Sequence, residues 1–337
     1  MKVLLTGGAG YIGSHTAVEL INAGHTAVIA DNFSNSSPDA VKRVEEITGA
    51  KIALYELDVC DKAALAKLFE AERPEAVIHF AGLKAVGESV AKPVWYYRNN
   101  IDSTLSLLEV MAEYGCKKLI FSSSATVYGS PEFLPITEEC KAGGCTNPYG
   151  WTKYMIERII EGAAVADKDL SAVLLRYFNP VGAHESALIG EKPNGIPNNL
   201  MPYICKVAGG ELKELSVFGN DYNTHDGTGV RDYIHVVDLA KGHVAALGFC
   251  EDHKGTEIFN LGTGVGYSVL DMVKAFERAN GVPVAHKIGP RRPGDIDACY
   301  ADPAKAEKLL GWKAEKNLDD MCHDSWSWQK NCLAENK

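Results

Sequence analysis

A run of closely spaced glycines near the amino terminus constrains the fold more than any other feature of this sequence. Gly8, Gly10 and Gly13 satisfy the pattern G-x-G-x-x-G. The preceding residues 2–6 have the pattern of a buried strand, and residues 11–23 that of a helix, which is the context in which the pattern indicates a dinucleotide site. The first glycines permit a tight turn, the next lets backbone approach a pyrophosphate, and Gly13 lets the helix pack closely on the strand. The loop therefore predicts a dinucleotide-binding unit.

The next apolar stretch favours one dinucleotide over another. Residues 27–30 form a strand candidate that ends in Asp31. A carboxylate at this distance from the glycine loop accepts hydrogen bonds from the adenosine ribose hydroxyls, and it would repel a 2'-phosphate. The sequence therefore predicts NAD rather than NADP.

Strand and helix patterns continue to alternate along the first half of the chain, which predicts an α/β fold with a doubly wound parallel sheet. Further strands are expected at 52–57, 76–80, 118–122 and 172–176, and helices at 61–71, 94–114 and 148–166.

The pattern changes after about residue 180, where proline and glycine become frequent. We expect an NAD-binding domain over residues 1–180 and a smaller substrate domain over 181–337, with some segments returning to the main sheet. The glycines of 262–266 lack a third glycine at the proper spacing, so they predict the start of a helix rather than a second nucleotide loop. Helices are expected at 197–208, 236–249, 267–280, 302–310 and 318–330.

Composition excludes several classes of protein. The chain has 337 residues and a net charge of -10, and without a block of basic residues a nucleic-acid partner is not expected. No stretch approaches the ~18 apolar residues of a membrane span, and the first apolar run is too short for a signal peptide. We therefore expect a cytoplasmic protein with no membrane partner. Nine cysteines, without C-x-x-C spacing, favour free thiols over disulfides or zinc, and no metal is expected.

A tyrosine and a lysine four residues apart suggest proton transfer. Tyr149 and Lys153 would share one face of a helix. To act as a base near neutrality, a tyrosine must lower its pKa from about 10 to about 7, which corresponds to about 4 kcal/mol. Lys153 is a source of such a field. Alone, the pair would be a solvated surface pair; the functional interpretation is favoured by polar residues at several successive strand ends, where ligands gather in such sheets. These are Asp58, the segment 80–82 and the serines 122–124.

These residues, with further segments, resemble the extended short-chain dehydrogenase/reductases and, more narrowly, the family of UDP-glucose 4-epimerases, also called UDP-galactose 4-epimerases. The similarity extends over nearly the whole chain. Residues 79–89 and 291–295 are the more specific segments, and the others are Gly7–Gly13, Asp58, Ser122–Ser124, Tyr149-x-x-x-Lys153 and Arg231-Asp232-Tyr233.

The resemblance implies a mechanism. Tyr149, held as a phenolate by Lys153 and the charge of the nicotinamide, would take the proton of the sugar C4 hydroxyl while C4 gives hydride to NAD+, and Ser124 would hydrogen-bond the same oxygen. The 4-keto sugar would turn over, and returning hydride would invert C4. Related 4,6-dehydratases carry an Asp-Glu pair after the catalytic serine or threonine. This chain has Ala125 and Thr126 there, so the chemistry should stop at C4.

The resemblance also implies the residues of the site, with NAD as cofactor and a UDP-sugar as substrate. The catalytic residues would be Tyr149, Lys153 and Ser124. The cofactor would contact Gly7, Gly10, Tyr11, Ile12, Gly13, Asp31, Asn32, Asp58, Val59, Phe80, Ala81, Gly82, Lys84, Asn99, Ser122, Tyr149, Lys153 and Tyr177. The substrate would contact Ser124, Phe178, Asn179, Asn199, Leu200, Ser216, Val217, Phe218, Arg231, Tyr233, Arg292, Asp295 and Cys299.

Two further expectations come from the same resemblance. A homodimer would pair through the helices at 94–114 and 148–166. In similar epimerases, a tyrosine at the position of Cys299 accompanies strict use of UDP-glucose and UDP-galactose, and a small residue accompanies use of the N-acetylated sugars. We therefore expect interconversion of UDP-N-acetylglucosamine and UDP-N-acetylgalactosamine as well. The alternatives are that Cys299 is an ordinary buried residue, or that Tyr300 fills the pocket.

Two other functions stay open. One is a net sugar-nucleotide oxidoreductase that uses NAD as a co-substrate, which would keep the same motifs but exchange its cofactor. The other is a non-catalytic, NAD-binding regulatory protein. The presence of Ser124, Tyr149 and Lys153 together disfavours this last function.

Overall fold

The computed structural model describes residues 1–193, 195–292 and 295–335. Pro293 and Gly294, which belong to the 291–295 segment, lie outside the described residues.

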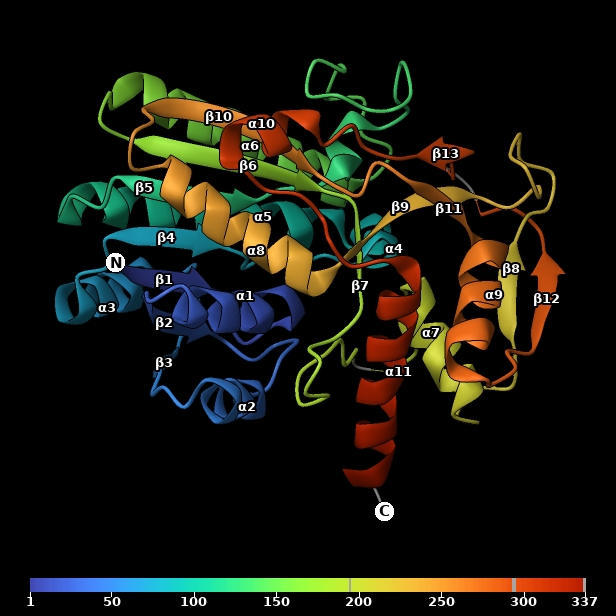
Figure 1. Cartoon of the computed structure of the whole chain (residues 1–337). Coiled ribbons are helices and arrows are strands. Elements are labelled where there is room, and N and C mark those ends of the chain that lie inside the picture. Colours follow the sequence, from blue (N-terminus) through green and yellow to red (C-terminus); the bar gives the residue numbers. More distant parts are fainter. Residues whose placement is uncertain (194, 293–294, 336–337) are drawn as a thin grey trace.

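A seven-stranded parallel sheet forms the centre of the molecule (Figure 1). Its strand order is β10-β6-β5-β4-β1-β2-β3, so the order reverses between β1 and β4, and at such a point the carboxyl ends of the strands open a crevice. The predicted doubly wound parallel sheet is confirmed. The strands are β1 (Lys2–Thr6), β2 (Thr26–Asp31), β3 (Ala53–Glu56), β4 (Ala76–His79), β5 (Lys118–Ser122), β6 (Ser171–Tyr177) and β10 (Gly255–Leu261).

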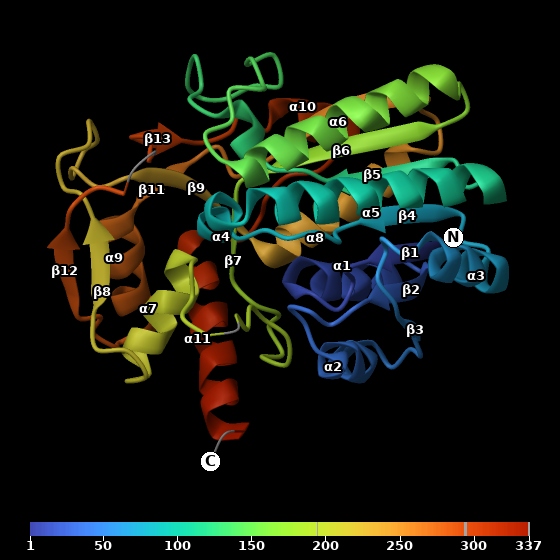
Figure 2. The same ribbon diagram turned by 180° about the vertical axis from the view of Figure 1, so that it is seen from behind.

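Helices cover both faces of this sheet. Leu5 and Ile29 point into one apolar cluster, while their chain neighbours Leu4 and Val28 point into another. Burial on both faces explains why these strands are apolar throughout instead of alternating. Helices α1 (Tyr11–Asn22), α2 (Pro38–Thr48), α8 (Val236–Phe249) and α10 (Ala304–Leu310) lie on the face seen in Figure 1. Helices α3 (Lys62–Glu72), α5 (Pro93–Tyr114) and α6 (Pro148–Ala166), with the short α4 (Val86–Ala91), lie on the face seen in Figure 2.

Helix α2 is one element that our sequence analysis missed. The side chain of Ser37 accepts a hydrogen bond from the amide of Asp39, and Pro38 occupies the first turn. Serine at the N-cap followed by proline is a helix-start signal that was present in the sequence.

A second apolar core lies beside the sheet, where α11 (Leu318–Glu335) packs on α7 (Leu200–Ala208) and α9 (Val269–Asn280), as Figures 1 and 2 show. Two small sheets border this core. One pairs β8 (Leu215–Phe218) with β12 (His286–Gly289), and the other joins β7 (Asn179–Val181), β9 (Val230–His235), β11 (Gly266–Ser268) and β13 (Ala298–Cys299).

Two segments from beyond residue 180 lie on the large sheet. Strand β10 pairs with β6 along its whole length, and α8 packs on α1. Such a return of later segments was anticipated, and the division into two domains at residue 180 stays a prediction.

The second glycine run, 262–266, was predicted to start a helix, and this was wrong. Its last residue, Gly266, begins strand β11, and α9 begins only at Val269. The amides of Thr263 and Gly264 donate to the carboxylate of Asp232 at 2.9 and 3.1 Å. A Cβ on Gly262 would lie 2.5 Å from that carboxylate. Glycine is therefore required there because any side chain would collide with Asp232.

In the described ranges, no helix is both long enough and apolar enough to cross a membrane.

Candidate active site

The glycine loop joins β1 to α1 and leaves the start of the helix open. A Cβ on Gly13 would lie 2.6 Å from the carbonyl oxygen of Gly7, so close packing requires glycine here. Gly10 is the N-cap of α1, and in the described part of the chain no side chain caps this helix. The first amides of the helix, at Tyr11 and Ile12, therefore stay free to bind an anion. These residues fit the pyrophosphate of a dinucleotide.

Asp31 supports the glycine loop from the end of β2. Its Oδ2 accepts the amide hydrogen of Ala9 at 3.0 Å, while its Oδ1 accepts from the amide of Phe33 and the hydroxyl of Ser36 at 2.9 and 2.7 Å. A carboxylate has about four acceptor positions. Asp31 therefore orders the loop and keeps acceptor capacity on Oδ2, where a ribose hydroxyl can donate.

Most of the other predicted cofactor residues lie at or just after the carboxyl ends of the neighbouring strands, which places them along one edge of the sheet. The amide of Asn32 lies 3.5 Å from the carboxylate of Asp58, so the ends of β2 and β3 meet. Val59 follows Asp58; Phe80, Ala81, Gly82 and Lys84 follow β4; Ser122 ends β5; Tyr177 ends β6; and Asn99 lies on α5.

The start of α6 places the predicted catalytic pair. The side chain of Asn147 caps the helix by accepting from the amide of Gly150 at 2.9 Å. Tyr149 and Lys153 then lie one turn apart and both are buried. The Lys153 ammonium donates to the carbonyl oxygen of Ser122 at 2.8 Å and lies 6.0 Å from the centroid of the Tyr149 ring. The tyrosine, the lysine and the end of β5 therefore form one cluster.

Burial dominates the electrostatics of this cluster. It raises the pKa of Tyr149, as does the nearby Tyr177, whereas a hydrogen bond with Ser124 opposes the rise. Burial also lowers the pKa of Lys153 to about 8. The protein by itself therefore keeps Tyr149 protonated. The rise in its pKa caused by burial exceeds the fall in pKa that we expected from Lys153 alone. Further positive charge in the site is needed to form the phenolate.

Ser124 is held by a residue that sequence reasoning did not assign to the site. The oxygen of Ser124 accepts from both the amide and the hydroxyl of Thr126, at 3.2 and 2.9 Å. With its acceptor positions used, Ser124 keeps its hydrogen to donate. Thr126 thus orients the predicted catalytic serine.

A buried ion pair behind the serines was also missed. Glu157 lies four residues after Lys153 on the same face of α6, accepts from the Ser123 hydroxyl at 2.6 Å and pairs with Arg176 of β6. An acidic residue on the buried face of the predicted helix was the signal that could have revealed it.

The predicted substrate residues come from the second core and its connections. Asp295 brings two of the arginines together: its carboxylate lies 3.7 Å from Arg231 and 3.2 Å from Arg292. The guanidinium of Arg292 lies over the ring of Phe218 at 4.8 Å. Burial raises the pKa of Tyr233 to about 12, and the two arginines oppose this rise. Arg231, Tyr233, Arg292, Asp295 and Phe218 therefore form one cationic cluster.

The other predicted substrate residues differ in how far their side chains are buried. Val217 packs into the second core, so only its backbone is available to a ligand. Its neighbour Ser216 is partly exposed. Phe178 is buried at the end of β6, and Asn179 pairs with Tyr233 in the register of β7 and β9.

Glu191, which was not predicted from the sequence as a site residue, connects a predicted cofactor residue with a predicted substrate residue. Its carboxylate accepts from Asn199 at 2.7 Å and lies 3.4 Å from the ammonium of Lys84. Asn199 directly precedes Leu200 at the start of α7. Two groups assigned to anionic ligands therefore share one carboxylate of the chain.

Cys299 ends β13 (Ala298–Cys299), and Tyr300 follows it. Cys299 pairs with Arg231 and packs in the cluster that contains Phe178. A Cβ on Gly266 would lie 3.2 Å from the ring of Tyr300. Because Cys299 packs against the cluster that contains Ala125, the neighbour of Ser124, and Tyr300 packs toward Gly266, this placement favours Cys299 as the residue on the catalytic side.

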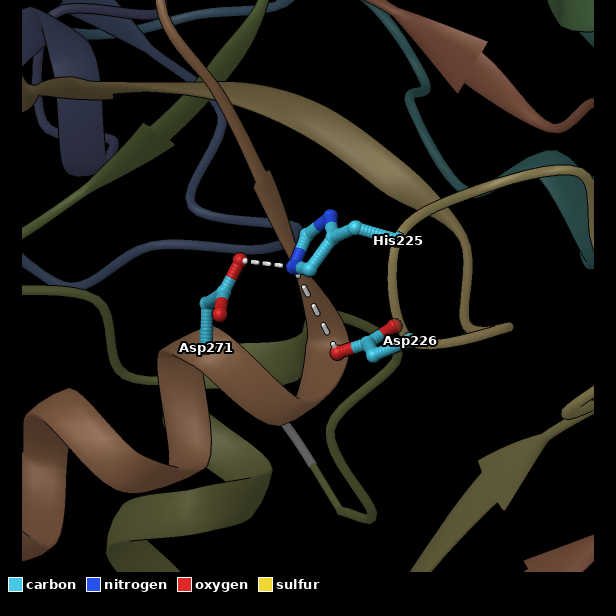
Figure 3. A group of neighbouring side chains, drawn as sticks. All are labelled: His225, Asp226 and Asp271. Carbon is cyan, nitrogen blue, oxygen red and sulfur yellow. Dashed lines mark ion pairs between the residues drawn. The ribbon is translucent and has the colours of Figure 1, made fainter.

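One group of side chains in the described ranges could hold a metal ion: His225, Asp226 and Asp271 (Figure 3). The imidazole Nε2 lies 3.0 Å from Asp271 and 3.8 Å from Asp226. Both carboxylates are already engaged, since Asp271 and Ser268 form the capping box of α9 and Asp226 accepts from the Ser268 hydroxyl at 2.5 Å. These three side chains therefore connect the loop that carries His225 and Asp226 to the start of α9.

Comparison with known proteins places the chain in a family. The profile described as "NAD dependent epimerase/dehydratase family" matches residues 3–262. The chain belongs to this family.

Within the NAD dependent epimerase/dehydratase family, the chain is similar to UDP-glucose 4-epimerases over nearly its full length. It is 60% identical to UDP-glucose 4-epimerase of Haemophilus influenzae, with 98% of each chain covered. The solved UDP-glucose 4-epimerase of Bifidobacterium longum, in complex with NAD+ and UDP, is 60% identical with a TM-score of 0.95 and 98% of each chain covered. That of Stenotrophomonas maltophila, with bound NAD and formylated UDP-arabinopyranose, is 50% identical with a TM-score of 0.97 and 99% of each chain covered.

Proposed function

We propose that this protein is an isomerase that interconverts UDP-glucose and UDP-galactose by inverting C4, with NAD retained through each cycle. The observation that carries the proposal is the cluster of Ser124, Tyr149 and Lys153 at the carboxyl end of β5, beside a loop that fits a dinucleotide. Similarity to UDP-glucose 4-epimerases at 60% identity over 98% of both chains supports the same function.

Tyr149 is the group that exchanges a proton with the C4 hydroxyl, and Ser124 lies near enough to lower the pKa of Tyr149. Ser124, whose own oxygen accepts from Thr126, donates to the C4 oxygen and orients it. Lys153 holds a positive charge between Ser122 and the Tyr149 ring. When bound, NAD supplies the acceptor and donor of hydride at C4, together with the positive charge that a buried phenolate needs. The helix start at Gly10, the ribose carboxylate Asp31 and the strand-end residues would hold it.

The cationic cluster supplies recognition of the diphosphate. Arg231 and Arg292 are planar cations that suit phosphate oxygens. Asp295 holds the two guanidinium groups near each other and prevents their mutual repulsion from separating them. Asn199 and Lys84 offer further donors, which Glu191 orients.

The residues after Ser124 limit the reaction. A 4,6-dehydratase requires an acid and a base at C5 and C6. Ala125 has no proton to exchange, and the hydroxyl of Thr126 is used on Ser124. The site is therefore suited to oxidation and re-reduction at C4 alone.

Use of the N-acetylated sugars is supported by the position of Cys299. Its side chain packs against the cluster that contains Phe178 and Ala125, the residue after the catalytic serine, while Tyr300 packs toward Gly266. A thiol at this place leaves room that a tyrosine side chain would fill. We include UDP-N-acetylglucosamine and UDP-N-acetylgalactosamine among the proposed substrates.

A homodimer is proposed through α5 and α6. Val94, Trp95 and Leu105 on α5 and Met155 on α6 are exposed apolar side chains on adjacent helices, and such clusters mark interaction surfaces. A cytoplasmic location is proposed as well, and nine free cysteines support a reducing compartment.

The deciding experiment incubates the purified protein with UDP-galactose, without added NAD, and analyses the sugar. UDP-glucose should appear with no net change in absorbance by reduced nicotinamide. Stoichiometric NADH would identify the net oxidoreductase instead. Retained NAD with an unchanged sugar would identify the non-catalytic, NAD-binding protein.

A further inference from the structure

Arg291 directly precedes the predicted diphosphate residue Arg292, and the proposed function gives it no role. The two arginines contact different parts of one segment. The guanidinium carbon of Arg291 lies 4.0 Å from the centroid of the Tyr222 ring. The guanidinium carbon of Arg292 lies 4.8 Å from the centroid of the Phe218 ring. Consecutive arginines therefore lie over two aromatic rings that are four residues apart in the sequence.

Arg291 is bound to the loop between β8 and β9 by its whole guanidinium group. Its Nε donates to Oδ1 of Asp221 at 2.7 Å, and its Nη2 donates to the carbonyl oxygen of the same residue. Its Nη1 lies 3.8 Å from the carboxylate of Asp297. The Arg291 side chain is 40% exposed, so the ion pairs alone would hold it weakly. Stacking on a ring together with a fork of donors requires a planar guanidinium, which lysine lacks.

The ring of Tyr222 has a fixed place in this loop. Tyr222 is only 5% exposed, and its amide donates to the carbonyl oxygen of Gly227 at 3.0 Å. A Cβ on Gly219 would lie 2.7 Å from the Tyr222 ring and 2.8 Å from Cγ of Arg291, so glycine leaves the space in which these two side chains stack. The Tyr222 hydroxyl is buried without a hydrogen-bond partner in the described ranges. The ring, and not the hydroxyl, therefore makes the contacts.

The contacts of Arg291 limit where Arg292 can lie. Strand β12 pairs with β8 as far as Gly289 and Phe218, and the amide of Gly219 donates to the carbonyl oxygen of Gly289 at 2.8 Å. Figures 1 and 2 show these two strands side by side next to α9. Strand pairing ends there, and Arg291 attaches the following residues to the same loop. The Cα atoms of Arg291 and Arg292 are about 3.8 Å apart, so fixing one restricts the other.

We propose that Arg291 is a positioning residue for substrate binding: stacked on Tyr222 and bonded to the backbone of Asp221, it holds Arg292 over Phe218, where Arg292 meets the diphosphate of the UDP-sugar. This inference rests on the proposed function, because it takes Arg292 as a ligand of the diphosphate.

The first test measures the binding of UDP to the NAD-loaded protein by calorimetry. Arg291→Met should raise the Kd for UDP about tenfold, the effect of about one charge-assisted hydrogen bond. KM for UDP-galactose should rise equally, while kcat stays within about twofold because the interaction is made in ground and transition states alike. Arg291→Lys keeps the charge but not the planar fork, so its Kd should rise at least about fivefold. Wild-type Kd in Arg291→Lys would overturn the stacking role.

The decisive test asks whether Arg291 acts through Arg292. Arg292→Met removes the proposed ligand and weakens UDP binding by itself. If Arg291 only positions Arg292, adding Arg291→Met to this variant should change Kd by less than about twofold. If the two losses multiply in the double variant, Arg291 acts independently of Arg292, and the proposal is overturned.

Two replacements of Tyr222 separate its ring from its hydroxyl. Tyr222→Leu removes the surface on which Arg291 stacks and should raise the Kd for UDP about fivefold. Tyr222→Phe keeps the ring and should stay within about twofold of wild type, because the hydroxyl has no partner to lose. An equal loss in both variants would assign the effect to the hydroxyl and overturn the proposal. If Tyr222→Leu does not fold, the double variant of the two arginines still decides.

A matched control separates positioning from a general loss of positive charge. Arg278 on α9 also pairs with a single aspartate, Asp319, and its side chain is 61% exposed. Arg278→Met changes the net charge by the same amount as Arg291→Met and should bind UDP as wild type does. Equal losses in Arg278→Met and Arg291→Met would overturn the positioning role.

Failure of the proposed function would be seen differently. A wild-type protein that leaves UDP-galactose unchanged would reject the epimerase activity, while the UDP affinities would still decide the role of Arg291. A wild-type protein that converts UDP-galactose, with an Arg291→Met variant that binds UDP equally well, would reject only the positioning role.

Discussion

Glu157 on α6 and Arg176 on β6 form a two-pronged ion pair that is almost completely removed from solvent. Arg176 Nε donates to Oε1 at 2.9 Å and Nη2 donates to Oε2 at 2.6 Å, with side-chain exposures of 2% and 0% for Arg176 and Glu157. The hydroxyl of Ser123 donates to the same carboxylate. The pair therefore fixes the helix that carries Tyr149 relative to the strand end that carries the serines.

Breaking this pair should destabilise the fold. Arg176→Met leaves the Glu157 carboxylate buried without its partner, which should lower the free energy of unfolding by about 3 to 5 kcal/mol. The double variant Glu157→Leu/Arg176→Met removes both charges and should be clearly more stable than Arg176→Met. Urea unfolding measures both. Equal stability of Arg176→Met and wild type would show that the pair does not support the fold.

Tyr149→Phe should abolish most of the activity and leave the structure intact. The hydroxyl is the proposed general base, and loss of acid-base catalysis costs about 10²- to 10⁴-fold in rate. UDP-galactose turnover measures the loss, and circular dichroism checks the fold. Near-normal turnover by a folded variant would assign the proton transfer to another group.

Lys153 should make stability depend on pH above 8. Its folded pKa of about 8 lies below the ordinary value of 10.5. Between these values the unfolded chain binds more protons, so the free energy of unfolding rises with pH. The cost of the buried ammonium, on the order of 3 kcal/mol, is fully present below pH 8 and fades toward pH 10.5.

The measurement compares wild type with Lys153→Met by urea unfolding at pH 7, 8, 9 and 10, which covers most of the interval between the folded pKa of about 8 and the ordinary value of 10.5. The difference in unfolding free energy between the two proteins should shift in favour of wild type as pH rises. A difference that stays constant over this range would contradict the lowered pKa.

Asp31→Asn should weaken the preference for NAD over NADP. The variant keeps an acceptor for the glycine loop but removes the charge that repels a 2'-phosphate. Reconstitution of cofactor-free protein with each dinucleotide measures the preference. Asp58→Asn, a carboxylate change at the neighbouring strand end, is the control and should leave the preference unaltered. If both variants discriminate like wild type, the ribose is recognised elsewhere.

Cys299→Tyr should remove turnover of UDP-N-acetylglucosamine while keeping turnover of UDP-galactose. The larger side chain would occupy the space beside Phe178 that an acetamido group requires. Tyr300→Phe is the matched control, because Tyr300 packs toward Gly266 and should affect neither substrate pair. Two results would contradict this role of Cys299. One is a wild-type protein inactive on UDP-N-acetylglucosamine, and the other is a Cys299→Tyr variant that turns over both substrate pairs as wild type does.

The sequence by itself determined the features that depend on local spacing. The glycine loop, six of the seven strands of the large sheet and the shared helical face of Tyr149 and Lys153 follow from the geometry of a turn, from short apolar runs and from the helical period of 3.6 residues. These rules operate within a few residues, so they hold before any tertiary contact forms.

Only the tertiary structure decided which distant residues meet and how burial changes them. His243 reaches Ser122 across 121 residues because α8 and β10 return to the large sheet, and Glu191 reaches Lys84 across 107 residues. The pKa of Tyr149 is raised, against the expectation from its lysine neighbour, because desolvation depends on every element that encloses the ring. Pairing across such distances is set by how helices and sheets pack, and no local pattern in the sequence records it.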